Sequence, residues 1–137
     1  GGAGNDLFDV RGSKTDVDAS KYVVIGDVSG GDKIKFDALV QASGFERVQD
    51  NVVKDATTLK EAINLAIESN QSASPILNKV FYFTYAGDTY VVHNATSTAV
   101  GTPDTLTAAD TVVKLAGVRS DDLILTADYT EGTLNIN

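Results

Sequence analysis

The first nine residues carry the residue types and spacing best suited to chemistry in this chain, and that chemistry is cation binding. Residues 1–9 read Gly-Gly-Ala-Gly-Asn-Asp-Leu-Phe-Asp, one full copy of the nonapeptide G-G-x-G-x-D-x-U-x, with Phe8 as the large apolar residue U. The glycines allow positive φ, which turns carbonyl oxygens inward, and Asp6 adds a carboxylate to the same concave turn. Oxygen ligands at this density suit calcium, which takes about six to eight of them. We therefore predict a metal-binding turn formed by Gly1, Gly2, Ala3, Gly4 and Asp6.

A glycine-rich hairpin or a flexible terminus is the alternative interpretation of residues 1–6, because glycine runs are common in linkers. The large apolar residue directly after a complete turn favours the calcium turn. Residues 7–10 are expected to form a short strand with Phe8 on one face. Turns and strands in alternation wind a parallel β-roll, in which each ion lies between two stacked turns. Since the chain opens inside the repeat without a methionine, we expect earlier repeats to precede Gly1.

The composition of the 137 residues indicates one globular domain, with 42% hydrophobic and 22% charged residues. Its net charge of −8 argues against nucleic acid and anionic membranes as partners and is compatible with metal cations. The chain has no cysteine, which excludes disulfides and leaves a zinc site with only His93 and carboxylates. No segment resembles a signal peptide or an apolar bilayer span of about 20 residues, so membrane insertion is not expected.

A second glycine-rich turn lies between two short apolar runs. Residues 21–25 are predicted to form a buried strand, and residues 34–36 alternate as a second strand. Residues 26–33, between them, read Gly-Asp-Val-Ser-Gly-Gly-Asp-Lys. A Walker phosphate-binding loop is excluded, because Asp32 stands where that loop needs a lysine directly after its last glycine.

Together these segments resemble the end of the β-roll in RTX (repeats-in-toxin) proteins, which carry the hemolysin-type repeat and include serralysin-like metalloproteases and S-layer or adhesin-type secreted proteins. In those families a segment like D-F-x-x-G-x-D-K-I closes the roll. Residues 32–34 match its Asp-Lys-Ile, whereas Asp27 occupies the position of the aromatic residue. The resemblance implies that Asp32 and then Asp27 complete the calcium site, with Asp16 and Asp18 as reserves; the alternative is that these are solvated loop carboxylates.

Residues 57–70 carry a clear helical pattern, in which Thr58 and Glu61 have the spacing of a capping box. The helix is predicted to cover a sheet through one apolar face, because its polar face has too few basic residues for a membrane surface. That face consists of Leu59, Ala62, Ile63, Ala66 and Ile67. Residues 37–55 lack a clean period, and we predict a loop there with a short strand at Val52-Val53.

Residues 80–93 predict a β-hairpin with Gly87-Asp88 as its turn and Tyr85 opposite Tyr90. His93 is predicted to lie on the outer face of the hairpin, opposite Tyr82, as a surface residue without a role. The inner face is predicted to be core, a sugar-binding platform being the alternative, and consists of Phe81, Phe83, Tyr85, Tyr90 and Val92.

After a threonine- and alanine-rich loop, a strand and turn are predicted at residues 110–118, and two further strands at residues 121–125 and 132–137. The fold class is therefore mostly β (α+β): the end of a parallel β-roll followed by an antiparallel sheet or sandwich with one packed amphipathic helix. We predict that residues 1–36 form the last roll turn and its closing segment. Residues 37–137 are expected to form a β-rich cap.

The C-terminal half also looks like the end of RTX and S-layer-like secreted proteins, and its tail places Glu131 before Leu134 and Ile136. The resemblance implies the terminal module of a secreted bacterial protein with an uncleaved signal that a type I ABC transporter recognises. The chain would cross unfolded, fold on extracellular calcium and cap upstream repeats. A calcium-dependent surface, S-layer or adhesin assembly module is the alternative. No nucleophile elbow or metal-hydrolase motif is present, so any catalysis is expected in an upstream part.

Overall fold

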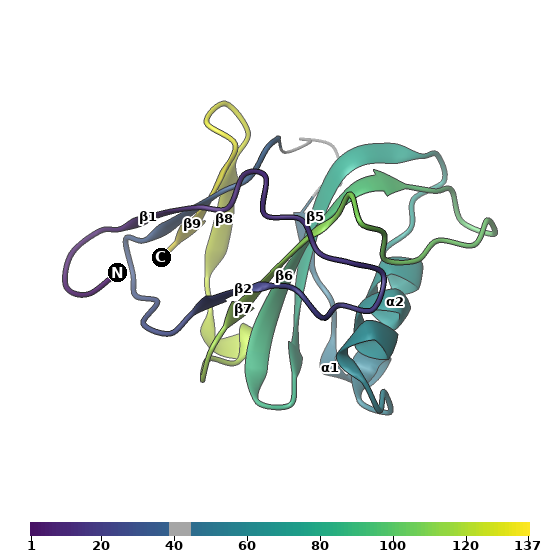
Figure 1. Ribbon diagram of the computed structural model, residues 1–137, viewed down its shortest axis with the longest axis horizontal. Helices are drawn as coiled ribbons and strands as arrows, with labels where there is room; N and C mark the ends of the chain where they lie inside the picture. Colours follow the sequence, from purple (N-terminus) through teal and green to yellow (C-terminus); the bar gives the residue numbers. More distant parts are fainter. Residues whose placement is uncertain (39–44) are drawn as a thin grey trace.

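The computed structural model describes residues 1–38 and 45–137, which form two β-sheets and a helical layer (Figure 1). The first sheet, sheet A, contains in spatial order β1 (Leu7–Asp9), β3 (Lys33–Lys35), β9 (Thr133–Ile136) and β8 (Leu125–Asp128). The second, sheet B, contains β2 (Val23–Ile25), β7 (Thr111–Leu115), β6 (Asp88–Ser97), β5 (Ile76–Tyr85) and β4 (Phe45–Arg47). The helices are α1 (Asp50–Val53) and α2 (Leu59–Ser69), with one 3₁₀ turn, η1 (Ser120–Asp122).

The N-terminal strands follow the path of one β-roll winding. β1 and β3 pair in parallel within sheet A, with Phe8 opposite Ile34. The strand between them in sequence, β2, lies in sheet B and pairs in parallel with β7. The chain thus passes from one sheet to the other and back, so that the turn before β1 and the turn before β3 lie side by side. The predicted mostly β fold with one packed helix is confirmed.

Residues 1–36 and 37–137 share both sheets. β3 continues sheet A by antiparallel pairing with β9, and β9 pairs with β8. In sheet B, β6 pairs antiparallel with both β5 and β7. The roll winding is therefore held by hydrogen bonds to strands that lie about one hundred positions later in the sequence.

Apolar side chains fill the space between the two sheets. Strands of the roll and of the cap both contribute to this inter-sheet core, because alternate residues of each strand face inward. Val24 is 57% exposed, however, because β2 is an edge strand of sheet B and buries only one of its faces. The prediction of a buried strand at residues 21–25 is therefore wrong. The fully buried members include Ile34, Phe36, Val91, Val113, Leu115 and Leu134.

The opposite face of sheet B is covered by helix α2, as predicted (Figure 1). The Thr58 hydroxyl caps the helix by accepting the Glu61 N–H at 3.1 Å. The Glu61 carboxylate in turn accepts the Thr57 N–H at 3.0 Å, so the reciprocal bond of the capping box falls one residue earlier. The predicted apolar face packs against Phe81, Phe83, Tyr90 and Val92, which confirms both faces as core.

The hairpin register differs from the prediction by two residues. Its turn is Ala86-Gly87, both with positive φ, and Tyr85 lies opposite Asp88. Positive φ at both central residues suits the right-handed twist of a two-residue hairpin. A shift of two keeps every side chain on its predicted face, since side chains alternate with period two. The prediction that His93 is a surface residue is wrong. It pairs with Val80, not with Tyr82, and its side chain is buried.

Two short strand predictions are wrong. Val52-Val53 belongs to α1, where Val53 is buried against α2 and tertiary packing overrides the β preference of valine. The strand predicted at residues 121–125 begins only at Leu125, because the preceding residues form η1. The rest of the predicted loop at residues 37–55 includes β4, while residues 39–44 lie outside the described part of the chain.

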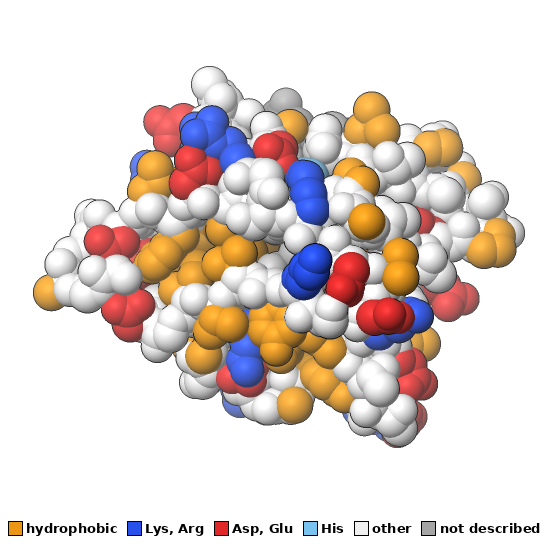
Figure 2. Space-filling model, viewed as in Figure 1, with side chains coloured by type: hydrophobic (Ala, Val, Ile, Leu, Met, Phe, Trp, Pro, Cys, Tyr) orange, Lys and Arg blue, Asp and Glu red, His pale blue; other side chains and the backbone are white. Residues whose placement is uncertain are grey.

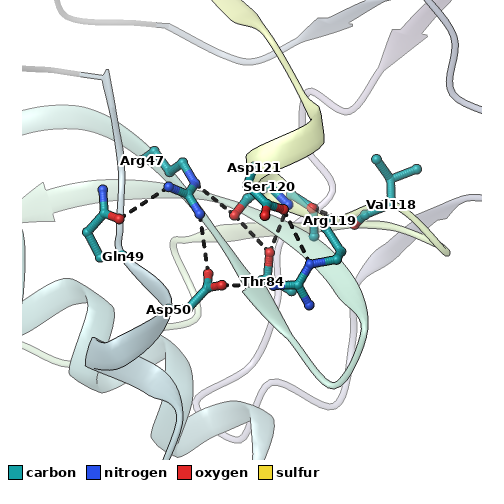
Figure 3. Close-up of polar contacts among 9 residues, drawn as sticks. Arg47, Gln49, Asp50, Thr84, Val118, Arg119, Ser120 and Asp121 are labelled. Atoms are coloured by element: carbon teal, nitrogen blue, oxygen red, sulfur yellow. Dashed lines mark hydrogen bonds and ion pairs between the residues drawn. The ribbon is translucent and has the colours of Figure 1, made fainter.

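A polar network around the buried Ser120 fixes the chain between β7 and β8 against sheet B (Figure 3). The Thr84 hydroxyl donates to Ser120 Oγ at 2.8 Å and accepts the Ser120 N–H at 2.8 Å. Arg47 Nε donates to Ser120 Oγ at 3.0 Å, and Arg119 pairs with Asp50 at 2.9 Å. Because Ser120 is fully buried, these partners replace its lost water. The network sets the point at which the chain crosses from sheet B to sheet A.

Candidate metal centre

The two glycine-rich turns, residues 1–6 and 26–32, lie side by side because they precede the paired strands β1 and β3. The Lys33 N–H donates to the Asp6 carbonyl at 2.8 Å and begins the β1–β3 ladder. Gly2 and Gly4 both have positive φ, as the nonapeptide predicts for a turn that directs carbonyl oxygens inward. Two sequence segments that are 26 positions apart thus lie side by side (Figure 1).

Asp32 joins the two turns through backbone hydrogen bonds. Its Oδ1 accepts the Asp6 N–H at 2.9 Å, and its Oδ2 accepts the Ser29 N–H at 2.8 Å. These bonds lower the pKa of the Asp32 carboxyl, so the side chain is charged at neutral pH although it is fully buried. Because both of its oxygens accept backbone N–H groups, Asp32 holds the two turns together.

Asp27 reaches the first turn from the second. Its Oδ2 accepts the Gly2 N–H at 2.6 Å, and its Oδ1 lies 3.3 Å from the amino group of Gly1. The Gly2 hydrogen bond and then the amino group lower the pKa of the Asp27 carboxyl. The side chain is about half exposed, unlike that of Asp32, so an ion approaching from solvent can reach it.

Asp6 supplies the one predicted carboxylate that faces inward without a partner. Its Oδ2 is buried and has no hydrogen-bond donor among the described residues. A Cβ placed on Gly1 would overlap this oxygen, so glycine is needed there for the carboxylate to lie inside the turn. A buried charged oxygen without a donor is costly, which makes this the position where a cation would be most favourable.

The remaining predicted site residues divide by position. Ala3 and Gly4 lie in the first turn, exposed to solvent. The reserves do not join it: Asp16 accepts the Ser20 N–H within its own loop, and Asp18 pairs with Lys60 on α2. In residues 1–38 and 45–137 no three Asp, Glu or His side chains converge in a metal-binding group. A calcium ion here would therefore depend on backbone carbonyls together with one or two carboxylates.

Two further residues shape the site and were not singled out from the sequence. The Asn5 side chain lies over Gly31, where a Cβ would overlap its amide oxygen. Gly31 has a φ of 101°, and its N–H donates to the Ile136 carbonyl at 2.7 Å. The C-terminal strand is thereby bonded to the second turn. Asn5 occupies an unspecified position of the nonapeptide, so the repeat pattern gives no signal for it.

Gly31→Ala is expected to destabilise the protein by at least about 1–2 kcal/mol, because alanine resists positive φ and its Cβ would displace Asn5. Gly30→Ala is the matched control, since its Cβ would lie 3.5 Å from the nearest described atom, an ordinary contact. Urea unfolding of both variants measures the difference. Equal stability of the two variants would contradict the stacked-turn geometry.

The structure gives little support for catalysis by the other candidate side chains. The imidazole of His93 lies in the inter-sheet region, and Ser120 is bonded to Thr84 and Arg47, so neither side chain faces a cleft as a nucleophile or a base would. In the described part of the chain, no helix combines the length and apolar character needed to cross a membrane. Neither the protein-family models nor the curated proteins with which the sequence was compared contain a match.

Proposed function

We propose that this chain is the calcium-binding terminal module of a secreted RTX-type protein, in which calcium between the paired turns completes the β-roll. The observation that carries the proposal is the parallel pairing of β1 with β3, which places the Gly1 turn beside the Asp27 turn around an Asp6 oxygen that has no partner among the described residues. Glycine carbonyls, carboxylates and a concave backbone are the surroundings that calcium prefers.

The three carboxylates would have different roles. Asp6 Oδ2 and the half-exposed Asp27 would contact the ion, together with carbonyl oxygens of residues 1–4. Asp32 would hold the two turns at the correct spacing through its bonds to backbone N–H groups. Without the ion, the acidic side chains repel each other and the glycine turns gain little to offset their lost conformational entropy. Folding of the roll winding would therefore be coupled to calcium.

Calcium is expected to raise the melting temperature. At 100 times the dissociation constant, an ion that binds only the folded state adds about 2.7 kcal/mol to the free energy of unfolding. We expect Asp6→Asn to lose most of this gain and Asp55→Asn, an exposed aspartate between α1 and α2, to keep it. Circular dichroism melts in a chelator and in increasing calcium measure the difference. A wild-type melting temperature that does not respond to calcium would refute the proposal.

Asp32→Asn separates the organising role from the ion-binding role. Because the amide keeps only one acceptor oxygen and its NH₂ group opposes a backbone donor, we expect a lower melting temperature in both chelator and calcium. Asp6→Asn should lower the melting temperature chiefly in calcium. Identical profiles of the two variants would contradict this division of roles.

Export by a type I transporter is the second part of the proposed function. The acidic and apolar tail at residues 131–137 supports it, and in the folded protein this tail includes β9, paired with β3 and β8. The signal would therefore be read before the module folds. Co-production with a type I transporter tests this point: we expect deletion of residues 131–137 to abolish secretion and Asp6→Asn to leave it intact. Equal secretion with and without the tail would contradict it.

The open end of the sandwich supports upstream roll turns as the partner. β1 and β2 are terminal strands of their sheets, and Leu7 and Val24 are each 57% exposed. Figure 2 shows hydrophobic side chains gathered between these two strands. A further repeat would pair with both edges and cover this surface. The same edge favours a surface-assembly module as the second candidate function, and concentration-dependent, calcium-dependent assembly in sedimentation experiments would select it.

A further inference from the structure

His93, the one histidine of the chain, lies at the contact between the two sheets. It lies on the face of β6 that carries Val91, directed toward sheet A, and only 1% of its surface is exposed. Its ring stacks on Phe36, which follows β3, with centroids 5.7 Å apart and planes within 15°. Phe36 is in turn bonded through its N–H to the Gly132 carbonyl of the β8–β9 turn. The imidazole is thus packed where sheet A meets sheet B.

The hydrogen bond to Ala38 defines which nitrogen of the neutral ring carries the proton. Nε2 lies 3.1 Å from the Ala38 carbonyl oxygen, which can only accept, so Nε2 carries the proton. Nδ1 is buried and has no partner among the described residues. Thr111, directly opposite on β7, has a buried hydroxyl that likewise makes no hydrogen bond to the described part of the chain. A small rotation or one bridging water would let this hydroxyl serve an unprotonated Nδ1.

We propose that His93 is an acid-sensitive latch between the two sheets: its neutral ring holds Phe36 and sheet A against sheet B, and its protonation releases them. A charged imidazole would be buried against Phe36 and the apolar inter-sheet core. Removing such a charge from bulk water is unfavourable. Opening the contact at Phe36 would return the charged ring to water and remove this cost.

The charged groups around the ring are Lys14 and Asp37, which pair with each other at 2.5 Å. Burial, first, and then the Lys14 charge lower the pKa of His93, while the Ala38 carbonyl and Asp37 partly oppose them. A lowered pKa in the folded state means that the unfolded chain binds the proton first. Stability is therefore complete above the usual histidine pKa of about 6.5 and is lost as pH falls below it.

Imidazole NMR of the wild-type protein is the direct test. A single histidine gives one set of ring ¹⁵N and ¹³C signals, so the tautomer and its titration can be read without a variant. In saturating calcium we expect the neutral Nε2–H tautomer from pH 8 down to the onset of unfolding. A ring that titrates near pH 6.5 in the folded protein, or an Nδ1–H tautomer, would overturn the proposal.

Urea unfolding of wild type and His93→Gln between pH 7.5 and pH 5 provides the second measurement. Relative to the variant, we expect the wild-type folding constant to fall by up to tenfold for each pH unit below about 6. Parallel pH profiles would overturn the latch. The carboxylates, including Asp110, whose pKa is raised by burial, are present in both proteins, so their contributions cancel in the comparison. Repeating the series in a chelator separates this result from the calcium proposal, because the latch does not require the ion.

Discussion

Phe83→Ala is expected to lower the free energy of unfolding by about 3–5 kcal/mol, the largest loss among the substitutions considered. Phe83 is fully buried between sheet B and α2. Its ring stacks on Phe81 at 6.3 Å and on Tyr90 at 6.0 Å. Removing it would leave a cavity in the layer beneath the helix, and the two neighbouring rings would lose their common contact.

Leu77→Ala is the matched control for Phe83→Ala, because Leu77 lies on the same strand and is 61% exposed. Urea denaturation monitored by circular dichroism gives the two free energies. The control should change by less than about 0.5 kcal/mol. We expect Phe83→Ala to leave the proposed calcium binding of the remaining folded protein unchanged, since the helical layer lies on the face of sheet B away from the paired turns. A loss below about 1 kcal/mol would show that α2 does not depend on this ring.

Ile34→Ala is expected to lower the free energy of unfolding by about 2–5 kcal/mol and to weaken the proposed calcium binding as well. Ile34 is fully buried in the inter-sheet core, and it stands opposite Phe8 on β1 and opposite Leu134 on β9. The strand that it anchors continues directly from Asp32. Loss of its side chain would loosen the β1–β3 pair, which sets the spacing of the two turns.

The control for Ile34→Ala is Leu7→Ala, on the paired strand but 57% exposed. Urea unfolding in chelator gives the stability of each variant, and calcium titration monitored by calorimetry gives its affinity. We expect Leu7→Ala to match wild type in both. If Ile34→Ala lost stability but bound calcium as wild type does, the coupling between the inter-sheet core and the turns would be refuted, while the core itself would remain.

The sequence alone determined the elements whose signals are local. The first turn, β1 and β3 follow from glycine spacing and from alternation within a few residues. Helix α2 follows from its period and its Thr58 cap, and the inner face of the hairpin follows from alternation, which survives a register shift of two. In each case the physical cause lies within one turn or one strand.

The candidate site was predictable in part for the same reason. The repeat identified Asp6 and the positive-φ glycines, and the resemblance to roll-closing segments identified Asp27 and Asp32. The sequence could not assign a separate role to each of the three carboxylates. The division of roles depends on which N–H groups face each carboxylate. Asp32 accepts one N–H from its own turn and one from the other turn, whereas Asp6 Oδ2 has no donor among the described residues. The position of Asn5 over Gly31 likewise exists only after the turns are paired.

Tertiary structure decided the features that depend on distant partners. Val53 became helical because α2 covers it, and residues 120–122 became a turn because Thr84 and Arg47 bind Ser120. The burial of His93 was set by Phe36, which lies 57 positions earlier and reaches it only through the meeting of the two sheets. Local propensity is worth a few tenths of a kilocalorie per residue, whereas burying a large apolar side chain is worth about 1.5–3 kcal/mol, so packing wins wherever the two conflict.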